Sequence, residues 1–104
     1  MKGHPMFYEL TKEEIKLHEV KSNDYGSDTD PLANFKRRAN IMAQYPNINW
    51  ATPECVAILD SLKQMDACLS LLERGLEGGV ETVDTRARDS HVLWKIARIL
   101  RRSK

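Results

Sequence analysis

The strongest constraint on the fold is one long apolar segment with a helix start signal at one end and a stop signal at the other. Thr52-Pro53-Glu54 supplies a capping side chain, a first-turn proline and a first-turn acid, and Arg74-Gly75 supplies a basic last turn and a glycine. Between these signals apolar residues recur at alternating steps of three and four, namely Cys55, Ile58, Leu62, Met65, Leu69 and Leu72, with Val56, Leu59 and Leu71 beside them. We therefore expect a helix that is buried on much of its circumference, as a core element or a subunit seam.

Three further segments carry helix patterns. Thr11-Lys12-Glu13-Glu14 matches a capping box and predicts a charged helix, a lid or flank, from Thr11 to about Asn23, after a partly ordered arm over residues 1–10. A second helix begins at Pro31 and ends before Pro46, and its predicted buried stripe comprises Leu32, Phe35, Ala39 and Met42. A fourth helix spans about residues 80–101 with two apolar rows, one of Val83, Ala87, Trp94 and Ala97, the other of Val92, Ile96 and Ile99. With no convincing strand pattern, residues 1–104 are predicted to form one all-α domain, a four-helix bundle-like fold.

Length and charge limit the classes of partner. A chain of 104 residues is small for a helical protein that also builds a deep pocket, so we expect homo-oligomerisation to complete the bundle. The net charge of +1 gives no overall preference for nucleic acid or acidic membranes. The charge is uneven, however, because residues 13–30 hold six acids and two bases whereas residues 86–104 hold seven bases and one acid. The basic segment belongs to no recognised DNA-binding module, so nucleic-acid binding is a minor hypothesis.

The two cysteines and the hydropathy pattern indicate the compartment. Cys55 and Cys68 lie about 20 Å apart along one predicted helix and cannot form a disulfide with each other. The sequence has no CxxC spacing, no signal-peptide pattern and no apolar run near the roughly twenty residues that a membrane span requires. We expect a cytoplasmic protein with reduced thiols and no membrane partner.

The junction between the first two helices combines polar and aromatic residues. Asn23-Asp24-Tyr25-Gly26 is predicted to stop one helix, through a glycine in the left-handed conformation, and Asp30-Pro31 is predicted to start the next. Asp24, Tyr25 and Asn34 are gathered where two helix ends converge. Such junctions often face a ligand, so these three side chains are candidates for a binding site.

Carboxylates on helices are the other candidates for chemistry, because the sequence has no nucleophile beside a base, no phosphate-binding glycine loop and no metal-type Cys/His spacing. Glu81, Arg88 and His91 share one face of the fourth helix, and Asp60 and Lys63 lie together on the third. Acids on facing helices are a means of holding Mg²⁺ in bundles. The alternative is a solvated charged face with salt bridges along each helix.

Taken in order, these residues resemble the small phage-encoded relatives of the MazG-like, all-alpha nucleoside triphosphate pyrophosphohydrolases. The resemblance extends from about Leu17 to Leu100 and is carried by His18-Glu19-Val20-Lys21, Asp24-Tyr25-Gly26, Asp30-Pro31-Leu32-Ala33-Asn34-Phe35, Lys63, Glu81 and Arg88-Asp89. It implies a helical dimer or larger oligomer in which helix-borne acids bind Mg²⁺ and a nucleotide triphosphate, and water attacks between the α and β phosphates. The implied nucleotide-binding residues are Asp24, Tyr25, Asn34, Lys63 and Arg88, and the implied metal ligands are Asp60, Glu81 and Asp89.

The sequence also departs from the family pattern at residues that matter for catalysis. Thr85 takes the place of the middle aspartate of the last helix, and Leu93 that of the usual tyrosine. On the third helix Leu62 precedes Lys63 where the pattern has an aspartate, and Asp66 stands in place of an arginine. Three functions remain open: a Mg²⁺-dependent pyrophosphohydrolase, a degenerate phage protein that sequesters a nucleotide signal or a host protein, and a purely structural helical oligomer.

Overall fold

The fold is all-α, as the sequence predicts. The computed structural model describes residues 2–26, 29–79 and 81–103, and within these ranges it contains helices and turns but no strand. The four helices are α1 (Pro5–Tyr25), α2 (Ala33–Ala43), α3 (Pro53–Glu73) and α4 (Val83–Arg102). None of them is long and apolar enough to cross a membrane, judged on the described residues.

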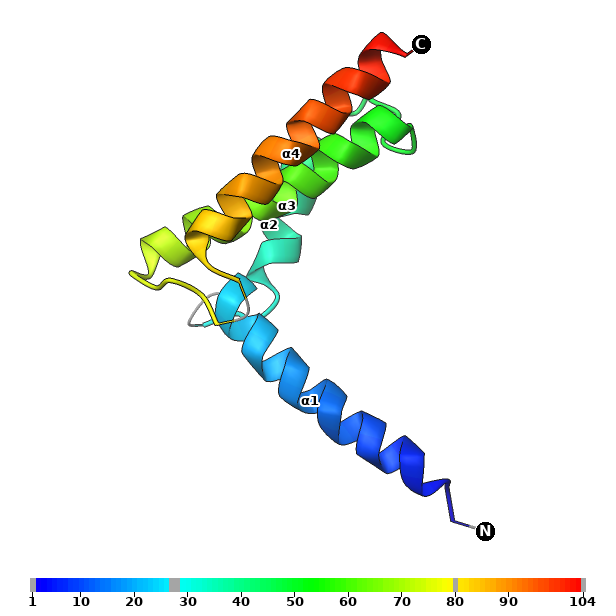
Figure 1. The fold of residues 1–104 in the computed structure, drawn as a ribbon, viewed down its shortest axis with the longest axis vertical. Coiled ribbons are helices and arrows are strands. Elements are labelled where there is room, and N and C mark those ends of the chain that lie inside the picture. Colours follow the sequence, from blue (N-terminus) through cyan, green and yellow to red (C-terminus); the bar gives the residue numbers. More distant parts are fainter. Residues whose placement is uncertain (1, 27–28, 80, 104) are drawn as a thin grey trace.

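The helices form a two-helix body with a projecting arm. Helices α3 and α4 lie side by side along most of their lengths, and α2 packs against α3 (Figure 1). Helix α1 contacts α3, and its N-terminal half projects away from the body (Figure 1). The molecule is therefore elongated, with extents of 54 × 38 × 25 Å.

The ends of α3 are those that the sequence predicts. The Thr52 hydroxyl accepts a hydrogen bond from the Cys55 amide at 3.3 Å, and Pro53 occupies the first turn. At the other end Gly75 has a φ of 68°. The amide of Leu76 donates to the Leu71 carbonyl at 2.9 Å and that of Gly75 to the Leu72 carbonyl at 3.2 Å, which is the Schellman pattern of hydrogen bonds.

Helix α4 begins with its own cap. The Thr82 hydroxyl accepts from the Thr85 amide at 3.2 Å, and the helix starts at Val83. The predicted start near residue 80 lies outside the described residues. The predicted end at residue 101 agrees with the structure to within one residue, because α4 ends at Arg102.

The predicted start of the first helix is wrong. Helix α1 begins at Pro5, and the Nδ1 atom of His4 accepts from the Met6 amide at 3.0 Å. A side-chain cap followed by proline is a start signal as good as a capping box. Thr11 therefore lies inside the helix, where its hydroxyl donates to the Phe7 carbonyl at 2.8 Å, and most of the predicted arm over residues 1–10 is helical.

Helix α1 ends at Tyr25, as the junction predicts, but Gly26 is needed for a different reason. Its φ of −76° lies in the extended region, not in the left-handed one. A Cβ atom on Gly26 would lie 2.7 Å from the Cα of Pro31 and 2.8 Å from the Ser22 carbonyl oxygen. Glycine at this position allows the two chain segments of the junction to touch.

Helix α2 begins two residues after the predicted start. Asp30 forms a turn first, in which its carboxylate accepts from the Leu32 amide at 2.9 Å, and the helix starts at Ala33. The predicted buried stripe is wrong, because Leu32 and Phe35 are 49% and 60% exposed. The residue of α2 that is buried is Asn34, at 4% exposure.

The hydrophobic core is small. Among the described residues the buried hydrophobic side chains are Ala57, Ala67, Leu71 and Ala97. Small polar side chains complete the α3–α4 contact, where the hydroxyls of Ser61 and Ser90 lie 2.8 Å apart. The predicted burial within the chain is therefore wrong for much of the apolar stripes, since Met65, Leu69, Leu72, Val92, Trp94, Ile96 and Ile99 are exposed. A subunit seam at these residues stays a prediction.

Candidate functional site

A pocket lies at the helix junction, between α1 and the start of α2. Its volume is about 520 Å³. Its walls are formed by Glu14, Leu17, His18, Lys21, Ser22 and Tyr25 of α1, by Pro31, Leu32, Asn34, Phe35 and Arg38 around α2, and by Lys63 of α3. The structure thus brings Tyr25, Asn34 and Lys63, three of the predicted nucleotide-binding residues, to one cavity.

The pocket combines aromatic rings with cations. The guanidinium carbon of Arg38 lies 5.1 Å from the centre of the Phe35 ring, and the ammonium of Lys63 lies 5.5 Å from the centre of the Tyr25 ring. Lys21 adds a third cation from α1, whereas Glu14 is the one carboxylate among those lining residues that the structure describes. A planar anionic molecule would find aromatic and positively charged side chains together in this pocket.

Asn34 places an unsatisfied acceptor in the wall of the pocket. Its side chain is buried, and its Oδ1 atom has no hydrogen-bond partner among the described residues. Leaving a buried acceptor unpaired costs roughly 1–3 kcal/mol. A ligand that carries an N–H or O–H donor would remove this cost on binding.

An ion pair holds the walls of the pocket together. Arg37 of α2 donates to both carboxylate oxygens of Asp66 on α3, at 2.7 and 2.9 Å. The same guanidinium donates to the Tyr25 carbonyl at 3.3 Å, which fixes the end of α1. The hydrogen bonds that Arg37 donates to the Asp66 carboxylate raise the pKa of Arg37. The family pattern has an arginine at the position of Asp66. In this chain Asp66 pairs with Arg37 instead, so its role is structural.

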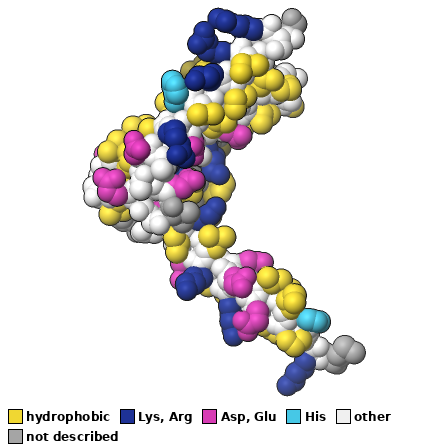
Figure 2. All heavy atoms as spheres, in the orientation of Figure 1, with side chains coloured by type: hydrophobic (Ala, Val, Ile, Leu, Met, Phe, Trp, Pro, Cys, Tyr) yellow, Lys and Arg dark blue, Asp and Glu magenta, His cyan; other side chains and the backbone are white. Residues whose placement is uncertain are grey.

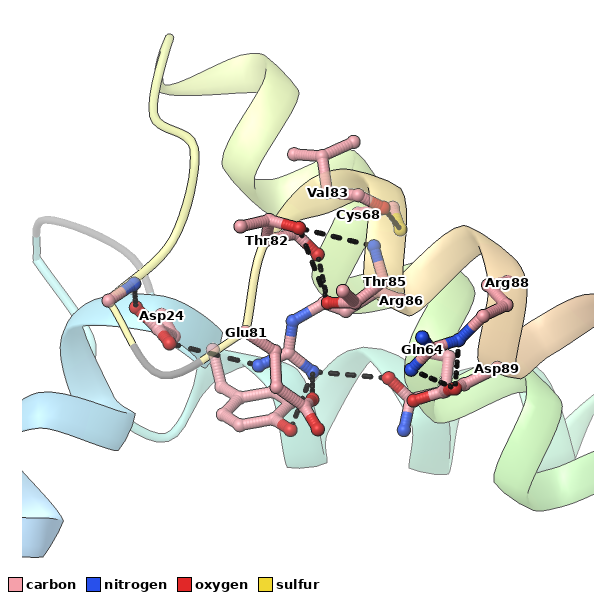
Figure 3. Close-up of polar contacts among 12 residues, drawn as sticks. Asp24, Gln64, Cys68, Glu81, Thr82, Val83, Thr85, Arg86, Arg88 and Asp89 are labelled. Carbon is pink, nitrogen blue, oxygen red and sulfur yellow. Dashed lines mark hydrogen bonds and ion pairs between the residues drawn. The ribbon is translucent and has the colours of Figure 1, made fainter.

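Beneath the pocket lies a buried arginine that connects four segments of the chain. Arg86 of α4 is fully buried, and its Nη1 atom donates to the Tyr25 hydroxyl at 2.6 Å and to the Gln64 side chain at 3.2 Å. Its guanidinium carbon also lies 4.2 Å from the centre of the Tyr25 ring. Figure 3 shows this side chain reaching from α4 toward Asp24 and Gln64. Tyr25 thus links the pocket between α1 and α2 to the interior of the protein.

Asp24 belongs to this buried cluster and does not line the pocket. It is 0% exposed, and its Oδ1 atom accepts from the Gly79 amide at 2.7 Å while its Oδ2 atom lies 3.8 Å from Nη2 of Arg86. Arg74 binds the backbone carbonyls of Asn23 and Asp24 from outside. The position of Asp24 indicates that it anchors the loop after α3 to the end of α1.

The predicted metal ligands are not brought together within the chain. Asp60 is exposed on α3, Glu81 lies 3.2 Å from Arg86, and Asp89 lies 3.2 Å from its neighbour Arg88, which is exposed and outside the pocket. Among the described residues no group of three acids, histidines or cysteines is placed to hold a metal ion. Mg²⁺ binding by these carboxylates stays a prediction of the resemblance.

Arg86 was not among the predicted site residues, because on the sequence it is one of several bases in the C-terminal segment. A signal for it was present, because Arg86, Ser90 and Ala97 fall at helical spacing on the face of α4 that packs against α3. An arginine in such a row is buried only with partners, so it points to a polar cluster. Lys21 is named above only within the His18-Glu19-Val20-Lys21 motif and Arg38 not at all, because the spacing of both is that of ordinary surface charge.

Comparisons with known proteins add no relative to this description. No family model matches the sequence, and neither curated proteins nor solved structures gave a match. A functional assignment therefore rests on the geometry of the pocket together with the sequence resemblance.

Proposed function

We propose that this protein binds a nucleotide or a nucleotide-derived ligand in the pocket between α1 and α2. The observation that carries the proposal is the meeting, in a single cavity, of two aromatic rings, three cations and an acceptor that has no hydrogen-bond partner among the described residues. A volume of about 520 Å³ is within the range of roughly 300–1,000 Å³ that small-molecule sites occupy.

Each part of the pocket suits one part of such a ligand. Phe35 is 60% exposed at the pocket wall and offers a face on which a base can stack. Lys21, Arg38 and Lys63 provide the positive charge that phosphate groups require. The buried oxygen of Asn34 would accept from a base amino group or a sugar hydroxyl.

We infer that the protein acts by binding and sequestration, with hydrolysis as the alternative. Glu81 and Asp89 are each engaged with an arginine, and Thr85 stands where the family pattern has a further acid. An acid set reduced in this way favours a ligand trap. Mg²⁺ binding and the release of pyrophosphate are expected only if the protein hydrolyses its ligand.

Isothermal titration calorimetry of the full chain with mono-, di-, tri- and cyclic nucleotides, in EDTA and again with Mg²⁺, tests the proposal. Replacing Phe35 with alanine should raise the Kd for the nucleotide by roughly tenfold, since stacking on one base contributes about 1–3 kcal/mol. Phe7→Ala is the matched control, because Phe7 is 66% exposed on the same protein but lies outside the pocket. Lys21→Met and Lys16→Met form a second matched pair on α1.

The outcomes separate the alternatives. Binding that is lost with Phe35→Ala and Lys21→Met but kept in both controls supports the pocket. Absence of binding by every nucleotide, or equal losses in pocket and control variants, removes the proposal. Pyrophosphate release above that of an Asp89→Ala variant would show that hydrolysis accompanies binding.

A further inference from the structure

One side of α4, turned away from α3, carries an uncovered apolar row. Val92, Ile96 and Ile99 are 45%, 41% and 58% exposed, and steps of four and three residues place them on one side of the helix. Helix α4 packs against α3 with another side, on which Ser90 and Ala97 are buried. At 3.6 residues per turn the two sides lie roughly 140° apart around the helix axis. We call Val92, Ile96 and Ile99 the outer row.

No other helix in the described part of the chain packs along the outer row. The main partner of α4 is α3, and α1 and α2 make their contacts with α3 as well (Figure 1). Leu93 and Leu100, both half-buried, lie between the outer row and the contact with α3, so they widen the apolar surface. Apolar side chains stabilise a protein only when they leave water, so the outer row would gain from a covering helix.

A line of cations borders the outer row on its other side. Arg88, Lys95 and Arg102 follow one another at steps of seven residues, and all three are exposed. Seven residues make nearly two turns, so the three cations form a line about 21 Å long at ~1.5 Å per residue, which we call the basic row. Arg88 lies 3.2 Å from Asp89, whereas Lys95 and Arg102 have no carboxylate partner among the described residues. Figure 2 shows lysine and arginine side chains gathered at the C-terminal end of the body, next to hydrophobic ones.

An apolar row bordered by charges at seven-residue spacing is typical of a helix that pairs with another helix. In such pairs the apolar rows interlock, and the charged positions beside them select the partner. A partner helix with acids beside its own apolar row would place those acids opposite the basic row. These ion pairs would lie at the exposed rim of the contact, so they would contribute mainly to specificity and to the rate of association.

The same charges disfavour a second copy of this chain at the outer row. If two copies met antiparallel, the two basic rows would face each other, and like charges brought together oppose association. If they met parallel, each basic row would face Leu93 and Leu100 of the other copy, which offer no negative charge. The pattern therefore favours an acidic helix of another protein.

We propose that the outer row and the basic row dock an amphipathic helix of another protein, with apolar residues along one side and acids beside them. The partner helix is about four turns long, because the basic row spans about 21 Å and one turn rises about 5.4 Å. No residue of either row lines the pocket between α1 and α2. Docking of the helix is therefore distinct from nucleotide binding in that pocket.

Two synthetic peptides, each about six helical turns long, test the proposal with the full chain. Both have leucine along one side at alternating steps of three and four residues, and the flanking positions hold glutamate in the Glu probe and lysine in the Lys probe. In isothermal titration calorimetry the Glu probe should bind saturably and about tenfold more tightly than the Lys probe, with a smaller difference at high salt.

A substitution in the outer row tests the apolar contact. Ile96→Asp should weaken binding of the Glu probe by roughly tenfold, because an isoleucine that the docked helix buries is lost. Leu69→Asp is the matched control, since Leu69 is 64% exposed but lies on α3. Unchanged far-UV circular dichroism verifies that both variants are folded.

Charge exchange tests the basic row. Lys95→Glu with Arg102→Glu should reverse the preference, so that the Lys probe binds more tightly than the Glu probe. Lys12→Glu with Lys16→Glu is the matched control, because it changes the net charge equally but on α1, and it should keep the original preference.

The proposal is overturned if the Glu probe does not bind, if Ile96→Asp and Leu69→Asp weaken its binding equally, or if the charge exchange leaves the preference unchanged. It is also overturned if Ile96→Asp dissociates an oligomer of the chain in sedimentation equilibrium, since the occupant would then be a second copy. Binding to phosphatidylserine vesicles or duplex DNA that Ile96→Asp removes would overturn it as well, because the occupant would be a membrane or a nucleic acid.

Discussion

Replacement of Arg86 by methionine is the most informative single perturbation of the interior. Both Arg86 and Asp24 are 0% exposed, and their charged groups lie 3.8 Å apart. Methionine retains much of the side-chain volume but leaves the Asp24 carboxylate without this cation. Removing one partner of a buried ion pair typically costs about 3–5 kcal/mol.

The loss should be large relative to total stability. Arg86 also donates to Tyr25 and Gln64, at 2.6 and 3.2 Å, and those acceptors lose their donor as well. Small domains have roughly 5–15 kcal/mol of stability in total. We therefore expect Arg86→Met to bring the protein close to unfolding at 37 °C. The free energy of unfolding of Arg86→Lys should lie between those of Arg86→Met and wild type, because lysine keeps the charge but not the planar guanidinium.

Urea unfolding followed by far-UV circular dichroism, at one fixed protein concentration, measures this loss. Arg88→Met is the control, since Arg88 is an exposed neighbour whose ion pair with Asp89 should contribute about 0–1 kcal/mol. In a double-mutant cycle, Asp24→Asn should recover part of the loss caused by Arg86→Met, because the buried carboxylate that Arg86 faces is then neutral. The reasoning is refuted if the free energy of unfolding of Arg86→Met lies within about 1 kcal/mol of the wild-type value. It is also refuted if the losses of stability caused by Arg86→Met and Asp24→Asn simply add in the double variant.

Three further predictions concern the junction around the pocket. Asp66→Ala should cost roughly 2 kcal/mol in urea unfolding, since it removes two charge-assisted hydrogen bonds to Arg37, whereas Asp60→Ala at an exposed site should leave the midpoint almost unchanged. Gly26→Ala should destabilise the protein more than Gly75→Ala does, because a Cβ at Gly26 lies 2.7 Å from the backbone of Pro31. A Cβ at Gly75 meets open space, and only the φ of 68° is unfavourable there. A lower melting temperature for Gly75→Ala than for Gly26→Ala would contradict this account. The hydrogen bond from Lys36 and that from the Leu32 amide lower the pKa of Asp30, so its contribution to stability is complete above the ordinary carboxyl pKa and is lost as pH falls through the lowered one. In an NMR titration Lys36→Met should move the pKa of Asp30 up toward its ordinary value, and an unchanged titration curve would show that Lys36 is not its partner.

The sequence predicts those features whose causes are local. The Thr52 cap, the Schellman end at Gly75 and the stop at Tyr25 depend on hydrogen bonds within a few residues, and such bonds can be anticipated from residue types alone. The start of α1 at Pro5 is also local, but two start signals compete there and the earlier one prevails.

Burial is harder to predict because it depends on surfaces distant in sequence. The apolar spacing of Met65, Leu69 and Leu72 is correct for a buried face, yet α4 packs against the neighbouring face, where Ala57 and Ser61 allow closer approach. The stripe pattern of α2 likewise predicts that Phe35 is buried, whereas Phe35 lies at the pocket wall. Stripe patterns show that a face is apolar, not what covers it.

The candidate site was predicted in part. The sequence predicts Tyr25, Asn34 and Lys63 as site residues, and all three line one pocket. The converging ends of α1 and α2 place Tyr25 and Asn34 there, whereas Lys63 comes from the middle of α3. Asp24 was chosen for the same site but turns inward to Gly79 and Arg86. That inward turn depends on the loop after α3, whose position no local pattern specifies.

The most direct test of nucleotide binding between α1 and α2 is mapping of amide chemical shifts in a ¹H–¹⁵N NMR spectrum during titration with the tightest-binding nucleotide. The account predicts that the largest shifts occur at residues that line the pocket, Ser22, Tyr25, Asn34 and Phe35 foremost, and that they saturate together. Shifts confined to the basic end of α4, around Arg98 and Arg102, would instead reveal general attraction of an anion and would contradict the central claim.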